Sequence, residues 1–481
     1  MGAQKVTDYF VYRYRYTIGL VGISVLLIAL VIGSLFFPGG ISHDEIQSVT
    51  TSTNTSLGAV KNFEYVVDLP YHALQRISVH YLGTSLVGIK LPSIIMAITG
   101  LGALFGVLAF WFRRNGAIFS AFVIATSTVF LITAQGGTPA IMVFFWSSMI
   151  LFFATLLTYA RKYKFLIATL LLLCIGFSLY TPFQIYLVIA LVVTALIHPH
   201  VRTVIYKRKW SILALAIVGS GIFLTPLIIA CINTPHTIVT LLGIPTSWQP
   251  GVWLANLKTL VVFQPPNSQN SLYPAFNFGI LLLMFVGLYR LFTVRYTARS
   301  YFLTTWCVFL VPLAIVSPNR APILMVPVFI LVGKGAKHLI NSWYRLFPHS
   351  PYARAAGLIP LAIVLVGLMS NGLERFIYGY HYNAFARASY SQDSLLLKRA
   401  MPRLASDKTV YLLVAPEQRE FYKLVTKHSS YVVVGSIADI PANTPTVVSA
   451  HYKPDIKKTP TKVLVDDRQF NSDRFYFYKN S

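Results

Sequence analysis

The chain has 481 residues, of which 55% are hydrophobic and only 11% carry a formal charge. A soluble domain normally has about 25% charged residues, so this composition excludes an ordinary soluble protein and indicates a polytopic membrane protein. The net charge of +25 also suits a nucleic-acid-binding protein. Most Lys and Arg residues of the membrane half flank apolar runs, however, which favours membrane orientation over nucleic-acid binding.

The first apolar run, residues 17–37, is too long for the core of a signal peptide, and no small-residue cleavage site follows it. We therefore expect a retained first span. Ten further apolar segments bring the predicted total to eleven spans, and they lie at about 90–112, 116–134, 139–160, 165–180, 183–197, 211–231, 276–294, 300–316, 321–333 and 357–370.

Every second loop between these segments is basic. The basic loops contain Arg113 and Arg114, and residues 161–164, 202–209, 290–299 and 334–354. The positive-inside rule places them in the cytoplasm, together with the N-terminus. The first outer loop, residues 38–89, and the tail then face outward from a cell membrane. The three cysteines lie in or beside apolar runs, which indicates packed or lipid-facing thiols rather than disulfides.

The tail, residues 371–481, differs from the rest in composition. It contains the short segments "TVYLLVA", "YVVVG", "PTVVSA", "KVLV" and "RFYFYK", with polar, helix-compatible stretches between some of them. This alternation predicts a small α/β domain. It has no phosphate-cradling glycine loop and no nucleophile elbow, so we expect a structural or acceptor-docking role. The predicted fold is a mainly α membrane bundle, residues 1–370, followed by this extracytoplasmic domain.

The carboxylates are distributed unevenly along the chain. Asp8 lies in the basic start, and Asp44, Glu45, Glu64 and Asp68 all lie in the first outer loop. No Asp or Glu occurs from residue 69 to residue 373. Any chemistry that needs a carboxylate beside the membrane therefore has its candidates in this one loop. The pair "DE" also suits the first turn of a solvated helix, because acidic side chains favour helix N-termini.

Four landmarks occur in order after the first span: "DE" at 44–45, "DLPYHAL" at 68–74, "LGTS" at 82–85 and "IKLPS" at 89–93. In this order and spacing the chain resembles C-type glycosyltransferases (GT-C), of the protein mannosyltransferase and lipid A aminoarabinose transferase group, over roughly residues 15–110. It departs from their pattern where Lys90 replaces the usual Arg, where Pro70 is a single proline, and where "AQGGTPA" lacks an Arg.

The resemblance implies transfer of a hexose or pentose from a polyprenyl-phosphate donor to a lipid, glycan or protein acceptor outside the cytoplasm. Asp44 is then the expected base that takes the proton of the acceptor hydroxyl. Glu45 is expected to orient the acceptor or to hold a cation. One base and a phosphate leaving group favour a single displacement with inversion, unlike the two facing carboxylates of glycoside hydrolases.

The leaving phosphate needs cations near it. Lys61 in the first outer loop and Arg320 in "SPNRAPILMVP" are the predicted donor-phosphate residues, although either can instead be a solvated or interfacial side chain. Glu64, Asp68 and His72 are predicted for the acceptor or a secondary site. No cofactor is predicted with certainty. If a divalent metal is bound, His43, Asp68 and His236 are its candidate ligands, although no local spacing is a ligand signature.

Two other functions remain open. A transporter or flippase of a lipid-linked or anionic substrate usually has ionisable residues within spans and two related halves. This chain has no carboxylate in any predicted span and no internal repeat that we detect. A glycan polymerase or ligase is the second alternative, and we expect such an enzyme to depend on Arg and His rather than on an Asp-Glu pair.

Overall fold

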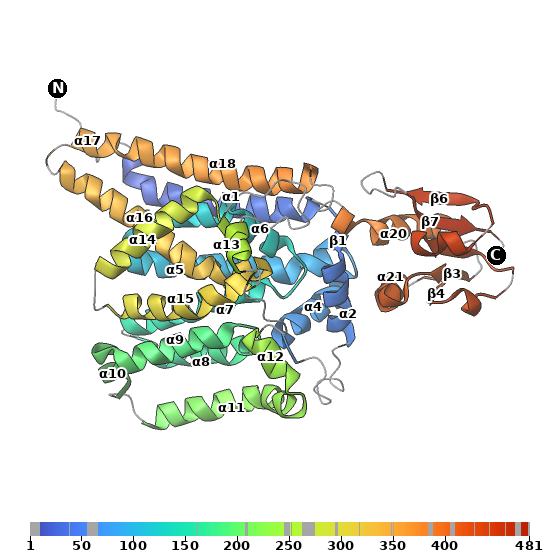
Figure 1. Ribbon diagram of the computed structural model, residues 1–481, viewed down its shortest axis with the longest axis horizontal. Helices are drawn as coiled ribbons and strands as arrows, with labels where there is room; N and C mark the ends of the chain where they lie inside the picture. The colour runs from blue at the N-terminus through green and yellow to red at the C-terminus, as the bar shows by residue number, and fades with distance from the viewer. Residues whose placement is uncertain are drawn as a thin grey trace.

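A computed structural model describes most of the chain. The described residues are 10–37, 39–54, 66–160, 162–206, 210–244, 251, 253–261, 275–293, 297–316, 318–347, 349, 351–382, 388–404, 409–427, 429–441, 443–456, 458–466 and 473–479. In Figure 1 the helical body, residues 10–382, lies on the left and the small C-terminal domain on the right.

The helical body is built mostly from long apolar helices that run side by side (Figure 1). Its helices are α1 Phe10–Phe36, α2 His43–Asn54, α4 Leu69–Leu82, α5 Leu86–Thr126, α6 Thr128–Gln135, α7 Ile141–Tyr159, α8 Lys164–Ser178, α9 Gln184–Ile197, α10 Pro199–Tyr206, α11 Trp210–Asn233, α12 His236–Leu242, α13 Trp253–Val261, α14 Phe278–Thr293, α15 Ala298–Val316, the 3₁₀ helix η3 Pro318–Leu324, α16 Met325–Leu346, α17 Pro351–Ala356 and α18 Leu358–Tyr382.

Within the described residues, six helices are long and apolar enough to cross a membrane, and up to eight segments qualify if each of two bent helix pairs is one span. The chain is thus an integral membrane protein. Three shorter apolar helices, α8, α9 and α14, lie at the remaining predicted positions. The predicted segments are therefore helical, but these three have 15, 14 and 16 residues, less than the roughly 20 residues that cross a bilayer unaided.

The helical run α5 contains two of the predicted spans. Its first span, Leu86–Phe112, is followed by a second apolar segment that begins at Gly116 and continues into α6. After α6 the chain is again beside the start of α5, because Gly137 lies against Ile89. The basic turn at Arg113 and Arg114 therefore lies at the opposite end of the bundle from residues 89 and 137, as the sequence predicts.

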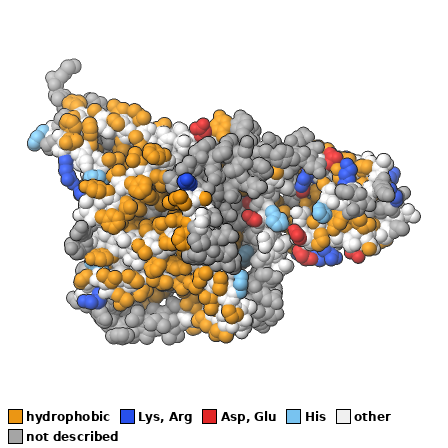
Figure 2. All heavy atoms as spheres, in the orientation of Figure 1, with side chains coloured by type: hydrophobic (Ala, Val, Ile, Leu, Met, Phe, Trp, Pro, Cys, Tyr) orange, Lys and Arg blue, Asp and Glu red, His pale blue; other side chains and the backbone are white. Residues whose placement is uncertain are grey.

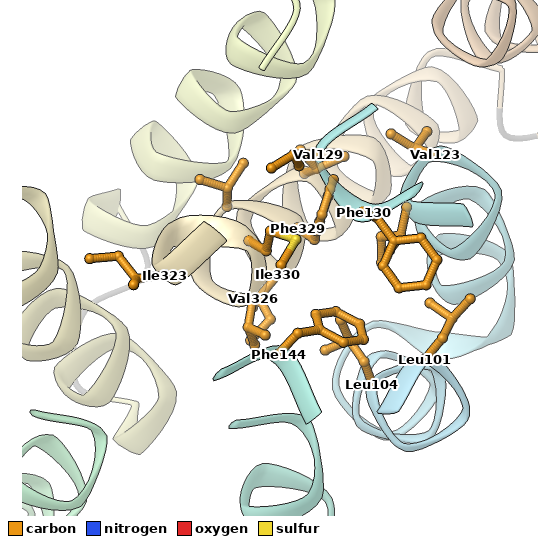
Figure 3. Close-up of a cluster of buried hydrophobic side chains, with 14 of the residues drawn as sticks. Leu101, Leu104, Val123, Val129, Phe130, Phe144, Ile323, Val326, Phe329 and Ile330 are labelled. Atoms are coloured by element: carbon orange, nitrogen blue, oxygen red, sulfur yellow. The ribbon is translucent and has the colours of Figure 1, made fainter. Parts of the chain in front are cut away.

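The core of the bundle lies between α5, α6, α7 and α16. Figure 3 shows the side chains that interlock there, including Leu104, Phe130, Phe144 and Phe329, all of which are fully buried. The rings of Phe130 and Phe144 meet edge to face with centroids 5.2 Å apart, a favourable arrangement for aromatic pairs.

The tail forms the α/β domain that its strand-like segments predict. Its described part contains a five-stranded sheet in the order β4-β3-β5-β7-β6. Strand β3 pairs parallel with β4 and β5, whereas β7 pairs antiparallel with β5 and β6. The elements are β2 Tyr390–Ser391, α20 Asp393–Leu404, β3 Val410–Leu413, η4 Pro416–Gln418, α21 Arg419–Thr426, β4 Tyr431–Val434, η5 Ile437–Asp439, β5 Thr446–Ser449, η6 Ala450–Asp455, β6 Lys462–Val465 and β7 Asp473–Tyr478.

The C-terminal domain packs directly on the first outer loop. Strand β1, Ile41–Ser42, pairs antiparallel with β2, with Ile41 opposite Ser391. Ile46 and Val49 of α2 share one buried cluster with Leu397 and Phe421 of the tail. A Cβ on Gly40 would lie 2.9 Å from the carbonyl carbon of Tyr390, so only glycine permits this close approach. The fold is thus a mainly helical membrane bundle with a docked α/β domain.

Candidate active site

A cavity of about 530 Å³ opens between the first outer loop and the C-terminal domain. Residues 41–46 form one wall, and the turn after α6 and Pro322 of η3 form another. The third wall comes from the tail, through residues 388–391, Asp393, Gln418, Tyr422 and Arg474. In Figure 2 acidic and histidine side chains gather where the helical body meets the C-terminal domain. The carboxylate pair predicted from the sequence therefore lines a cavity.

The two carboxylates of that pair have opposite environments. Asp44 is exposed, and its carboxylate has no hydrogen bond or ion pair with any residue that the structure describes. Glu45 is buried, with 1% of its surface exposed. Both belong to the first turn of α2, where successive residues point about 100° apart, and both line the cavity. Of the two, only Asp44 is exposed.

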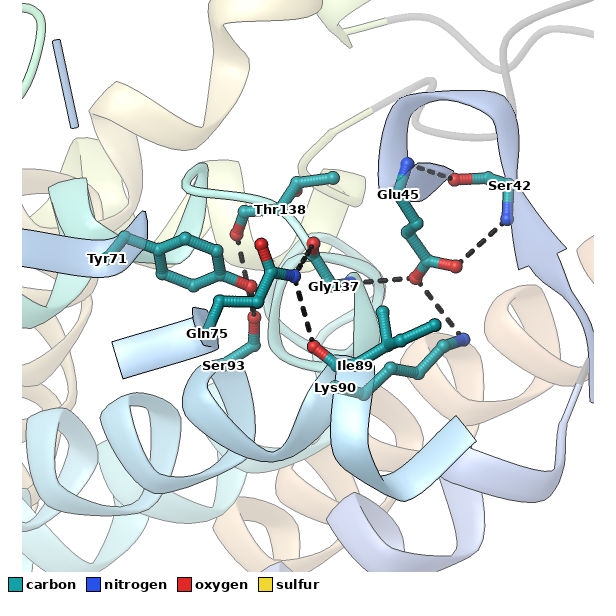
Figure 4. A network of polar contacts seen from close by, with 9 residues as sticks. All are labelled: Ser42, Glu45, Tyr71, Gln75, Ile89, Lys90, Ser93, Gly137 and Thr138. Carbon is teal, nitrogen blue, oxygen red and sulfur yellow. Dashed lines mark hydrogen bonds and ion pairs between the residues drawn. The ribbon is translucent and has the colours of Figure 1, made fainter. Parts of the chain in front are cut away.

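Glu45 is held by three groups in the interior, as Figure 4 shows. Its Oε1 accepts a hydrogen bond of 2.7 Å from the backbone N–H of Gly137 and lies 3.3 Å from Nζ of Lys90. Its Oε2 accepts from the backbone N–H of Ser42 at 2.9 Å, while the Ser42 hydroxyl accepts from the N–H of Glu45 at 3.2 Å. This reciprocal pair is a capping box, which begins α2 at a defined residue.

The turn at Gly137 reaches Glu45 because it lacks a side chain. A Cβ at this position would lie 2.7 Å from Ile89 and 3.4 Å from Glu45. The "AQGGTPA" loop, which has no Arg, therefore contributes a backbone N–H to this network instead. Lys90 is itself fully buried, and its Nζ lies 5.4 Å from the centre of the Tyr390 ring in β2. One buried cation thus contacts both Glu45 and the tail.

A second polar network joins α2 to α4. Gln75 is fully buried, and its Oε1 accepts hydrogen bonds from Ser48 at 2.8 Å and from Ser52 at 2.6 Å. Its Nε2 donates to the carbonyl oxygens of Gly137 at 2.9 Å and Ile89 at 3.2 Å, which fixes α4 against the start of α5 (Figure 4). These bonds set the position of α2, and hence of Asp44.

His72 belongs to the same network. Its Nδ1 is 2.8 Å from the Ser52 hydroxyl, and burial lowers the pKa of its imidazole to about 4. His72 is therefore neutral at physiological pH, and it lies inside the protein rather than on the wall of the Asp44 cavity.

Asp68 precedes α4 in a left-handed conformation, with φ of 57°. Its N–H donates to the carbonyl of Tyr180 at 2.9 Å. Burial raises the pKa of its carboxyl to about 8, although a hydrogen bond with Thr181 acts in the opposite direction. Asp68 therefore lies at the turn between α8 and α9, away from the Asp44 cavity wall.

Arg320 lies at the same turn. Its guanidinium donates to the carbonyl of Gly243, the residue that ends α12, and lies 5.3 Å from the centre of the Phe183 ring. Arg320 does not line the Asp44 cavity, although Pro322 of the same 3₁₀ helix does. An apolar cavity of about 380 Å³ adjoins this turn, lined by leucine and isoleucine side chains of α11 and α12 and by Thr181.

A third cavity, of about 380 Å³, extends from the Asp44 cavity over the tail. His43, Asp393, Gln418 and Arg474 line both cavities. Its floor is formed where β3 and β5 end, at residues 415–418 and 449–451. Because β3 and β5 are parallel, their carboxyl ends meet at one edge, which is the usual position for ligands in such sheets.

Three predicted site residues remain, and the structure describes only one of them, His236, which does not line the Asp44 cavity. Lys61 and Glu64 lie outside the described residues. His236 begins α12 and is exposed, with its Nδ1 3.4 Å from the hydroxyl of Thr240. Among the described residues no three His, Cys, Asp or Glu side chains gather as a metal site would require. The candidate ligand set of His43, Asp68 and His236 is thus not assembled.

Comparison with known proteins agrees with this architecture. A family model for dolichyl-phosphate-mannose-protein mannosyltransferases matches residues 70–229. The crystal structure of ArnT from Cupriavidus metallidurans in the apo state superposes with a TM-score of 0.52 at 12% sequence identity, over 95% of this chain and 98% of that chain. The chain has the fold of the GT-C glycosyltransferases. No curated protein sequence matches it significantly.

The GT-C fold is also seen in the similarity to the archaeal oligosaccharyltransferase AglB from Archaeoglobus fulgidus. Its complex with an inhibitory peptide and a dolichol-phosphate superposes with a TM-score of 0.50 at 12% identity, over 92% of this chain and 70% of that chain. The same enzyme tethered to an acceptor peptide gives a TM-score of 0.51 at 11% identity, over 90% and 65%.

Several residues of this cavity and its surroundings were not found from the sequence. Asp393 and Arg474 form a two-pronged ion pair in the cavity wall, with both contacts at 2.6 Å, although the tail showed no motif. Lys90 was noted as a departure from a family pattern but was not assigned to the site. Two signals were present: the Ser42-x-x-Glu45 spacing of a capping box, and a lone lysine in an apolar helix, which needs a buried counter-charge.

Proposed function

We propose that this protein is a glycosyltransferase that moves a sugar from a polyprenyl-phosphate donor to an acceptor on the outer face of the membrane. The observation that carries the proposal is Asp44, a carboxylate left without a partner among the described residues, in a cavity between the membrane helices and the docked tail. The GT-C fold and the mannosyltransferase family match over residues 70–229 support the same reaction class.

Asp44 is suited to act as a general base. As the acceptor hydroxyl oxygen attacks the anomeric carbon, Asp44 takes its proton, and the bond between that carbon and the carrier phosphate oxygen breaks. The phosphate leaves with the electron pair, so the configuration is inverted in one displacement. Glu45 is buried against Lys90, and we propose that it positions α2, and therefore Asp44, rather than reacting itself.

The donor is proposed to enter beside Arg320. The dolichol-phosphate in the AglB complex shows that a protein of this fold binds a polyprenyl carrier. In this chain the apolar cavity lined by α11 and α12 suits a prenyl chain, and Arg320 contacts Gly243 at the end of α12. A guanidinium there is suited to the carrier phosphate, because Arg binds phosphate through two parallel hydrogen bonds.

The acceptor is proposed to approach over the C-terminal domain. The cavity at the carboxyl ends of β3 and β5 shares His43 with the Asp44 cavity, so a molecule held there reaches the base from the tail side. The role of the tail is then acceptor docking, which agrees with the absence of a catalytic motif in its sequence.

The experiment is complementation of a strain from which the gene has been deleted. Mass spectrometry of cell-envelope glycans identifies the glycan lost on deletion, and wild-type protein is expected to restore it. Asp44→Asn is expected not to restore it, because a general base contributes about a hundredfold or more to rate. Asp439→Asn is the matched control, since Asp439 is exposed and lies in neither cavity.

The outcomes separate the two parts of the proposal. Full restoration by Asp44→Asn, at a protein level equal to that of the control, would remove Asp44 as the base but leave the transferase in place. A deletion strain whose envelope glycans are unchanged would contradict the transferase itself. A transporter or flippase would instead move a lipid-linked sugar without making a new glycosidic bond, so the lipid-linked precursor would accumulate on one face.

A further inference from the structure

A second large cavity lies at the other end of the bundle. It has a volume of about 540 Å³ and begins at Trp111 and Phe112, where the first span of α5 ends. Lys90, beside Glu45, is 22 residues earlier on that helical run, which corresponds to about 33 Å at 1.5 Å per residue. The cavity is therefore on the opposite membrane face from Asp44, and it is distinct from the donor site proposed above.

Five cations from three helices line this cavity. Arg290 comes from α14 and Arg299 from α15, while Lys334, Lys337 and Arg345 come from α16. All except Arg345 are half-buried rather than fully solvated. A residue that only sets membrane orientation has no need to be withdrawn from water, so positive-inside topology alone does not account for this arrangement.

The close packing of α14 on α16 brings these charges together. A Cβ on Gly287 would overlap the carbonyl oxygen of Leu331, and one on Gly335 would overlap that of Leu283. The backbones of α14 and α16 are therefore in contact. Arg290 and Lys334 lie within one helical turn of this contact. Arg290, Arg299 and Lys337 all lie near enough to repel the ammonium of Lys334.

Among the residues that the structure describes, no carboxylate lines this cavity. None of the lining residues is Asp or Glu, and the sequence has neither between residues 69 and 373. In Figure 2, Lys and Arg side chains lie at the end of the helical body farthest from the C-terminal domain. Half-buried like charges repel one another, and a bound anion would relieve that repulsion.

Arg299 is already held in place. Its guanidinium lies 5.2 Å from the centre of the Trp111 ring and donates to the Trp111 carbonyl at 3.1 Å and to the Tyr159 hydroxyl at 2.9 Å. Holding an arginine in advance lowers the entropy cost of binding an anion. The floor of the cavity is apolar, through Phe112, Leu291 and Leu303.

We propose that this basic cavity binds a phosphate group. Arginine and lysine together recognise phosphate, through the guanidinium fork and the ammonium point charge. The phosphate group can belong to the headgroup of an anionic membrane lipid or to a soluble phosphate. The experiment below distinguishes these two ligands. The inference does not depend on the transferase activity proposed above.

The experiment measures binding to the purified full chain. Native mass spectrometry compares dioleoyl phosphatidic acid with dioleoyl phosphatidylcholine, and titration calorimetry uses inorganic pyrophosphate. Arg290→Gln/Lys334→Gln is expected to weaken binding of the phosphate probe by about tenfold or more, because two charge-assisted contacts are lost. Lys162→Gln/Lys164→Gln is the control, since it removes two exposed lysines that do not line the cavity.

Arg299→Lys provides a second variant that keeps the charge, and it is expected to weaken binding as well because the fork and its stacking on Trp111 are lost. Loss confined to phosphatidic acid identifies a lipid headgroup, and loss confined to pyrophosphate identifies a soluble phosphate. Equal binding by both cavity variants and the control would overturn the proposal, as would failure of the wild-type chain to bind either phosphate probe.

Discussion

At the scale of single residues, neighbouring carboxylates in the first outer loop take different roles because their surroundings differ. Asp44 is exposed in a cavity, whereas Glu45 next to it is buried against a lysine and two backbone N–H groups. Asp68 is different again: burial keeps its carboxyl protonated to a higher pH. The residue type alone did not distinguish these three roles.

Asp68 is predicted to make the stability of the protein depend on pH. Its pKa is raised from 3.8 to about 8 in the folded chain, so the unfolded chain releases the proton at lower pH than the folded one. The neutral carboxyl thus contributes fully below about pH 4, and this contribution is lost as the pH rises through 8. Asp68→Asn is expected to remove that loss.

The measurement is the midpoint of thermal unfolding of the purified protein between pH 5 and pH 8. The advantage of Asp68→Asn over wild type is expected to grow with pH, whereas Asp439→Asn, at an exposed position, should show no such trend. An advantage that stays constant from pH 5 to pH 8 would mean that Asp68 titrates normally in the folded protein.

At the scale of elements, the start of α2 is joined to α5 and to the turn after α6 by one buried carboxylate. Glu45 caps α2 through Ser42 and meets Lys90 in α5 and the N–H of Gly137. Three segments that are far apart in sequence therefore meet at one carboxylate. Because Glu45 is the next residue after Asp44, these contacts also fix the position of Asp44.

Glu45→Gln is predicted to destabilise the protein strongly. It leaves Lys90 charged and buried without its counter-charge, and breaking such a pair from one side costs about 3–5 kcal/mol. Glu420→Gln makes the same chemical change in an exposed pair with Lys423 and should cost less than about 1 kcal/mol. Thermal or denaturant unfolding of the two variants provides the comparison.

The double variant Glu45→Gln/Lys90→Met supplies the second arm of this test. It removes both charges, so it is expected to recover part of the stability that Glu45→Gln loses. If Glu45→Gln proved as stable as Glu420→Gln, the buried pair would have no structural role.

At the scale of the whole molecule, the C-terminal domain completes the cavity at one end of the helical body. The strand pair β1–β2, the shared apolar cluster and a hydrogen bond of 3.0 Å from Lys398 to the carbonyl of Thr84 join it to the first outer loop. Arg474 and Asp393 then form part of the cavity wall. The cavity therefore depends on the docked arrangement of both parts.

An engineered cross-link is predicted to form across β1 and β2. Residues directly opposite in an antiparallel pair have Cβ atoms about 4.5–5.5 Å apart, so Ile41→Cys/Ser391→Cys should oxidise to a disulfide in a background with Cys174, Cys231 and Cys307 changed to Ala. Mass spectrometry of peptides detects the link. Ile41→Cys/Ser436→Cys is the control, because Ser436 is exposed after β4 and pairs with no strand residue of the loop. Equal linkage in both would mean that the domain is not docked as described.

Much of the architecture followed from the sequence, because burial in a membrane imposes a pattern on every residue of a segment. The apolar runs, the two apolar segments of α5 on either side of residues 113–114 and the five strand segments of the tail are all seen in the structure. The short polar breaks between apolar runs predicted the ends of the helices less well. Hydropathy alone did not indicate how short helices such as α8 and α9 are.

The sequence by itself also pointed to the first outer loop as the place for carboxylate chemistry, because the chain has no other acidic residue before residue 374 apart from Asp8. Only the tertiary structure decided which of those carboxylates is open and which is buried. Exposure of a side chain depends on segments distant in sequence: Lys90 and Gly137 enclose Glu45, and the tail walls the cavity that Asp44 faces. The local sequence pattern does not predict such contacts, because they form only when the helices and the C-terminal domain pack together.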